Sequence, residues 1–190
     1  NHNHSLSING GSEKIQNRTS FGYSRQLGDA KGNNLSQFTV ASNTTVRLWE
    51  QLTVNMTVNG SMRKVDGFAY GVDPFSYAYN TSRVIPCYNE DGTLLYHEKS
   101  GRNSDAVQGK TTYNYNILNE QAHTGSENNT RTWGATFDLR WLLFGDLEYQ
   151  GMFSYSSSSS DSKKYATERS YYISEIRGYE YGSVAPNSVE

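Results

Sequence analysis

The 190-residue chain has one cysteine, three prolines and no long hydrophobic run. The single Cys87 excludes an intrachain disulfide framework. No stretch approaches the roughly 20 apolar residues of a transmembrane helix, and no positively charged, apolar leader opens the chain. The formal net charge is −2 and no stripe of basic residues is present, so the composition gives no reason to expect nucleic-acid binding.

Acidic and histidine residues are scattered and form no catalytic constellation. Asp138 and Glu148 fall close to one turn, but Arg140 is near enough to neutralise either carboxylate, which favours an ion pair over acid–base chemistry. His2 and His4 have the spacing of ligands on one strand face, without a supporting cluster of Cys or carboxylates. We therefore predict no enzyme activity, no metal site and no cofactor.

The chain is rich in tyrosine and in alternating patterns. Only 35% of its residues are hydrophobic, yet it carries 15 tyrosines and three tryptophans, residues that suit strands and interfaces. From Phe38 to Leu48, and again from Leu52 to Met62, apolar residues occupy every second position for most of the length. The same rhythm follows from Thr132 to Trp141 and from Leu147 to Ser156. Successive side chains in a strand face opposite sides, so these segments predict long strands with one apolar face.

Connections between the predicted strands are strongly unequal. Short turns are expected near Gly11, Glu50 and Gly145, whereas long polar connections occupy 28–34, 73–130 and the tail that begins with the serine run at Ser156–Ser160. This asymmetry is typical of outer-membrane barrels. We predict an all-β fold: an antiparallel meander of long strands with long loops on one side, forming a segment of a transmembrane β-barrel. Residues 1–190 are expected to be a single barrel region without a plug domain.

The long stretch from Arg63 to Asn129 is expected to be functional or partly structured. Asp73 and Pro74 predict the start of a short helix, and Asn116–His123 predicts another. Five aromatic residues of this region are our candidate site, a loop that binds ligand or docks a partner, with packing of the loop on itself as an equal alternative. They are Tyr70, Phe75, Tyr77, Tyr79 and Tyr88.

Several stretches resemble one known family, the SusC/RagA-like TonB-linked outer-membrane transporters of Bacteroidetes. The similarity covers most of the chain, and it depends on the order and spacing of the stretches rather than on any single motif. They are Leu6 to Lys14, Ser20 to Tyr23 with Gly28, Leu52 to Asn55 after Trp49, Asp73 to Phe75, Ser82 to Pro86, Tyr88 to Gly92, and Tyr115 to Glu120.

The resemblance implies a plug-and-barrel nutrient importer in the cell outer membrane, in contact with outer-membrane lipid. Such an importer is energised by TonB and lidded by a SusD-type surface lipoprotein that captures glycans or peptides. The chain departs from the full pattern because it has no plug, no TonB-contacting segment and too few strands to close a barrel. We therefore expect a fragment, an early barrel segment whose parent contacts TonB through its missing N-terminal part.

A second interpretation is a soluble β-sandwich or jelly-roll module that binds carbohydrate. In that fold the apolar strand faces would form a dry core. Alternation alone does not separate the two interpretations. Strand length and loop asymmetry favour the barrel segment, because sandwich strands are usually shorter and their loops more even.

Overall fold

The computed structural model describes residues 1–101, 111–144 and 147–183. It is 61% strand and 12% helix, which confirms the predicted antiparallel meander of β-strands. The chain forms two compact units. Unit 1 comprises Asn1–Leu27, Asn34–Val65 and Asn128–Ser162, and unit 2 comprises Gly28–Asn33, Asp66–Glu127 and Lys163–Glu190. The expectation of a single barrel region spanning 1–190 stays a prediction.

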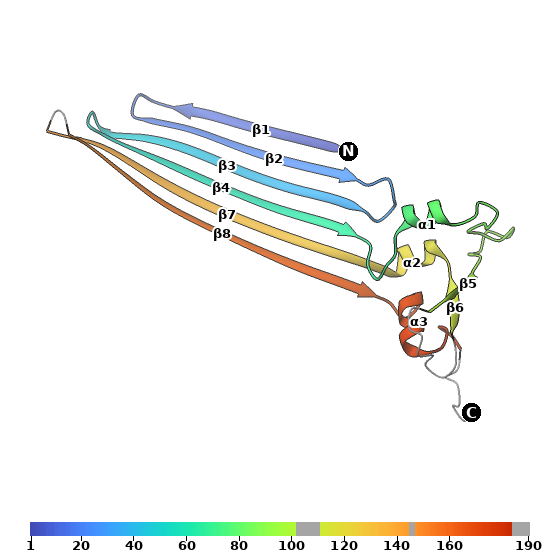
Figure 1. Cartoon of the computed structure of the whole chain (residues 1–190). Helices are drawn as coiled ribbons and strands as arrows, with labels where there is room; N and C mark the ends of the chain where they lie inside the picture. The colour runs from blue at the N-terminus through green and yellow to red at the C-terminus, as the bar shows by residue number, and fades with distance from the viewer. Residues whose placement is uncertain (102–110, 145–146, 184–190) are drawn as a thin grey trace. The chain divides into compact units, whose positions relative to one another are not determined.

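Unit 1 is one layer of strands that lie side by side (Figure 1). Within the described residues the sheet has six strands in the order β1-β2-β3-β4-β7-β8. The strands are β1 (His2–Gly11), β2 (Ile15–Leu27), β3 (Asn34–Trp49), β4 (Leu52–Gly67), β7 (Thr124–Leu143) and β8 (Leu147–Ala166). The sheet is not closed into a barrel, so β1 and β8 form two edges.

The predicted tight turns join the strands in pairs. Ser12 donates its backbone N–H to the Ile15 carbonyl at 2.6 Å, which closes the turn between β1 and β2. β3 ends at Trp49 and β4 begins at Leu52, as the sequence indicated. The turn at Gly145 and Asp146 lies outside the described residues.

Strand register assigns every alternate residue to one of two faces. Phe21 pairs with Val40, and Tyr23 pairs with Phe38, so their side chains share a face. We call this face A and the opposite one face B. Face B of β3 and β4 is fixed by a hydrogen bond of 2.8 Å from the Thr45 hydroxyl to the Asn55 side-chain oxygen. The predicted division of each strand into an apolar and a polar side is therefore the division that the pairing produces.

The serine run is a strand, and our expectation of a solvated loop there is wrong. β8 continues to Ala166, opposite a β7 that begins at Thr124. Hydroxyl groups meet across the pair: Thr132 and Ser158 are 3.4 Å apart, and Thr130 and Ser160 are 3.3 Å apart. Uninterrupted serines carry no alternation signal, so only the partner strand reveals that they are extended.

Unit 2 contains three short helices and a two-stranded sheet. They are α1 (Pro74–Asn80), α2 (Ile117–His123), α3 (Tyr171–Arg177), β5 (His97–Ser100) and β6 (Thr112–Tyr115). The first two helices confirm the sequence prediction. Asp73 caps α1 by accepting the N–H groups of Phe75 and Ser76, each at 3.1 Å. Asn116 caps α2 in the same way.

The core of unit 2 is small and aromatic. Its buried members are Val72, Tyr113, Tyr115, Ile117 and Tyr171. The tyrosine rings meet edge to face, with the ring centres of Tyr115 and Tyr171 5.4 Å apart. Leu52 is the one buried apolar residue among the described residues of unit 1, so the apolar core that the structure describes lies mainly in unit 2.

Gly60 on β4 supplies a test of the packing on face A. A side-chain carbon at this position would lie 2.6 Å from the ring of Trp133 on β7, whereas one at Gly10 would meet nothing within 4 Å. We expect Gly60→Val to lower the free energy of unfolding by about 1–3 kcal/mol, because the indole must leave its rotamer or the strands must separate.

The matched control is Gly10→Val, for which we expect a change within about 0.5 kcal/mol. Denaturant unfolding followed by circular dichroism measures both variants. Equal losses in the two would contradict the close approach of Trp133 to Gly60.

Candidate functional site

Face A of unit 1 carries an apolar band that starts at the tight turns. On β2 and β3 it is interrupted by a group of polar side chains, those of Asn17, Thr19, Ser42 and Thr44. On β4 it runs from Leu52 to Met62, and on β7 from Leu143 back to Trp133. Each of these stretches is 11 residues long, which is the length of a strand that crosses a membrane at a tilt. Most of its large side chains are exposed: Trp133 is 46% and Phe153 is 67% accessible. An exposed apolar surface of this extent marks a contact with protein or lipid.

The far edge of the band is oblique to the strands. On β8 the band ends at Tyr155, which the Thr136–Ser154 contact of 3.0 Å places level with Ala135; the next large ring on this face is Tyr165, ten residues further on. On β7 the band ends two residues further on, at Trp133, which lies against Gly60 of β4. On β4 it ends at Met62, two residues beyond Gly60. The edge therefore climbs along the strands from β8 to β4. Strands that are tilted in a membrane require such a slope, because the membrane plane cuts them obliquely.

Aromatic residues are concentrated at both edges of the band. Tyr23 and Phe38 end it on β2 and β3, as Trp133 and Tyr155 do on β7 and β8. Trp49, Trp141 and Phe144 lie at the tight-turn end, where Trp49 is 66% and Phe144 is 93% exposed. Aromatic rings with polar tips are typical of the two interfaces of a membrane.

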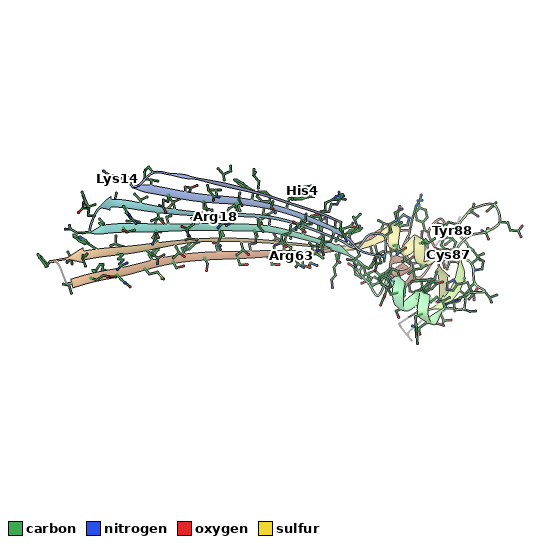
Figure 2. The ribbon with its side chains drawn as sticks, turned by 90° about the horizontal axis from the view of Figure 1, so that it is seen from above. His4, Lys14, Arg18, Arg63, Cys87 and Tyr88 are labelled. Atoms are coloured by element: carbon green, nitrogen blue, oxygen red, sulfur yellow. The ribbon has the colours of Figure 1, made fainter. Side chains whose placement is uncertain are left out.

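Face B is mostly polar, with Met152 and Val65 among its apolar exceptions, and side chains stand off both faces of the strands (Figure 2). The amide of Asn43 donates to the Thr57 hydroxyl at 3.2 Å. Near the last turn the expected ion pair forms, with the Arg140 guanidinium 2.8 Å from the Glu148 carboxylate. Both groups are at the surface, so the pair contributes little to stability.

Unit 2 has a hollow of about 380 Å³ that the sequence did not reveal. It is lined by Tyr96, Asn114, Asn119, Arg169, Ser174, Glu180 and Tyr181. The Arg169 guanidinium lies 4.8 Å from the centre of the Tyr181 ring, and the Tyr96 hydroxyl donates to the Asn119 side-chain oxygen at 3.2 Å. Burial, followed by the nearby charge of Glu120, raises the pKa of Tyr96, so its hydroxyl stays protonated. Aromatic rings beside amides and charges suit a hydroxyl-rich or peptide ligand.

Glu120 holds the wall of this hollow in place. Its side chain is 1% exposed. Both carboxylate oxygens accept the backbone N–H of Tyr171, at 2.9 and 3.0 Å, and one also accepts the Asn119 amide at 2.9 Å. The carboxylate thereby joins α2 to the first turn of α3, where exposed N–H groups favour a negative charge.

The five aromatic residues that we predicted as a site are not brought together. Tyr77 packs into the unit 2 core, with its ring centre 5.7 Å from that of Tyr115, and Tyr70 stacks on Tyr172 at 4.0 Å. Phe75, Tyr79 and Tyr88 are exposed, at 57%, 90% and 54% respectively. Packing of the region on itself thus accounts for two of the five. Whether the other three bind a ligand or a partner stays a prediction.

None of the described helices is long and apolar enough to cross a membrane. Among the described residues, no three His, Cys, Asp or Glu side chains form a group that would hold a metal ion. His2 and His4 stack with ring centres 6.4 Å apart.

The two tyrosines of α1 give contrasting predictions. We expect Tyr77→Ala to lower the free energy of unfolding of unit 2 by about 2 kcal/mol, because a ring packed on Tyr115 and His97 is lost. Tyr79→Ala, at a residue 90% exposed, should change it by less than about 0.5 kcal/mol. Denaturant unfolding checks both, and a larger loss for Tyr79→Ala would contradict these placements.

Glu120 gives a prediction that depends on pH. Burial raises the pKa of its carboxyl above the ordinary value, so the folded chain binds this proton more tightly than the unfolded chain does. The stabilisation by the proton is complete below the unfolded pKa and is lost as the pH rises through the folded one. The variant Glu120→Gln mimics the neutral form and cannot titrate.

We therefore expect the difference in free energy of unfolding between the native chain and Glu120→Gln to fall as the pH rises above about 4.3. Thermal or denaturant unfolding across that range measures it. A constant difference at every pH would contradict a raised pKa.

No protein-family model matches the chain, and a search of curated proteins returns no significant match. The resemblance to SusC/RagA-like transporters accordingly stays a prediction.

Proposed function

We propose that this chain is part of the wall of an outer-membrane, TonB-dependent nutrient importer that takes up glycans or peptides. The observation that carries the membrane part is the apolar band on face A. It has the length of a tilted membrane crossing, it is edged by aromatic residues, and it is backed by a polar face B. In this proposal outer-membrane lipid covers face A, and face B lines the lumen.

The importer part of the proposal is supported by the resemblance of the chain to the SusC/RagA-like transporters. A SusD-type lipoprotein would be the surface partner, and TonB would act through a part of the parent that this chain does not contain. The exposed Phe75, Tyr79 and Tyr88 of unit 2 are available for contact with that lipoprotein or with the ligand. Scattered carboxylates and a solitary cysteine offer no arrangement for catalysis, so transport is proposed and not an enzyme reaction.

The soluble sandwich module has less support. A sandwich buries the apolar face of one sheet under a second sheet about 10 Å away. Within unit 1 the described strands make a single layer, and the face that a sandwich would bury is the exposed one. No observation favours the sandwich over a membrane wall.

Adjacent residues on β7 test the orientation of the sheet. Phe137 lies on face A near the middle of the band, and Thr136 lies on face B, where its hydroxyl is 3.0 Å from that of Ser154. An arginine facing lipid near the bilayer centre costs about 2–4 kcal/mol. We expect Phe137→Arg to weaken insertion of the chain into lipid vesicles at least tenfold, and Thr136→Arg to change it less than threefold.

Insertion is measured by flotation with vesicles, and circular dichroism in mild detergent checks that both variants fold. Light scattering of the native chain accompanies the test. Dimers or aggregates in plain buffer that change in detergent support the proposal. A chain that is monomeric in buffer, indifferent to detergent and absent from vesicles would refute it.

A further inference from the structure

Basic residues follow directly after the apolar band on several strands. Moving outward along face A, the first residue beyond the last large apolar side chain is Lys64 on β4 and Arg131 on β7. On β2 Arg25 follows Tyr23 and precedes Leu27 on the same face. On β2 and β4 each follows Tyr23 or Met62 by two positions and therefore shares its face. All three are exposed. The edge of the band is thus marked by positive charge as well as by aromatic rings.

Two of these cations border one hollow on face A. The hollow measures about 260 Å³. It is lined by Tyr23, Ser36, Gln37, Phe38, Met62, Arg63, Lys64, Asn129, Thr130 and Arg131. One side is apolar, formed by Phe38 and Met62, and the other is polar and carries Lys64 and Arg131. An amphiphile would find a surface for its chain and a charged group for its head within one depression.

Strand register places the two cations close together. Trp133 lies against Gly60 across the β4–β7 pair, so Arg131 falls beside Met62 and diagonal to Lys64. Diagonal neighbours on one face are about 7–8 Å apart, and long side chains bridge that distance. An arginine offers a planar pair of donors and a lysine a compact ammonium, and both bind phosphate oxygens.

We propose that Lys64 and Arg131, at the edge of the apolar band, bind the phosphate of an anionic membrane lipid whose acyl chain lies on Met62 and Phe38. This inference rests on the proposed function, because it requires face A to contact lipid. Charge complementarity identifies the occupant. The apolar band matches the acyl chain of a lipid, and the cations at its edge match an anionic headgroup.

The test compares the full chain on vesicles of phosphatidylcholine alone and on vesicles that also contain phosphatidylglycerol, at one ionic strength. A basic residue near an anionic surface contributes about 1 kcal/mol, or roughly fivefold in binding. We expect the native chain to prefer the anionic vesicles. Lys64→Gln and Arg131→Gln should each reduce that preference about fivefold, and binding to phosphatidylcholine should change little.

Arg18→Gln is the matched control, since Arg18 pairs with Asn43 on face B and is not among the residues that line the hollow (labelled in Figure 2). It removes the same charge from the opposite face. Circular dichroism in detergent confirms that the variants fold.

Equal losses for Arg18→Gln and Lys64→Gln would show a general charge effect and overturn the lipid site. Binding to both kinds of vesicle without preference would overturn it as well while leaving the membrane proposal intact. Failure to bind either kind would refute both. Release from anionic vesicles by inorganic phosphate, beyond the effect of chloride at equal ionic strength, would show a site for free phosphate and overturn the assignment to lipid.

Discussion

Strand register is the constraint on which the rest of unit 1 depends. A slip of one residue would exchange the two faces of a strand and place its apolar residues among polar ones. Side-chain bonds oppose such a slip on both faces. Asn17 on face A donates to the Thr44 hydroxyl at 2.7 Å, and Thr45 on face B donates to Asn55 at 2.8 Å. Polar residues on both faces thus fix the register that gathers most of the large apolar residues on face A.

The sequence predicted those parts of the fold that local chemistry determines. Alternation located the strands and their faces, and the caps Asp73 and Asn116 located two helices. The predicted strands ended earlier than the observed ones, because alternation stops where both faces become polar, as in Ser156–Ser160. The helix α3 was missed, although its Ser170 N-cap and Gly178 in the left-handed conformation form a recognisable pair of end signals.

The candidate site was less predictable than the fold, because it depends on long-range contacts. Tyr77 and Tyr79 are similar in the sequence, yet one packs into a core and the other is 90% exposed. The hollow of unit 2 joins Tyr96 to Arg169 and Tyr181, which are more than 70 positions later in the chain. Glu120 reads as an ordinary helix residue until Tyr171 supplies the N–H group that its carboxylate accepts. No local sequence pattern predicts these contacts between residues that are distant in the chain.

The longest strands outlast the apolar band. β8 continues from Ser157 to Ala166 after its last band residue, Tyr155, and the ten residues of that extension span about 33 Å along the strand. In the proposed orientation this extension is a mainly hydrophilic part of the strand outside the lipid, and its length is comparable to the thickness of the hydrocarbon layer. A nutrient approaching the cell would meet hydrogen-bonding hydroxyls well before it reached the level of the membrane, so selection among ligands would begin outside the bilayer.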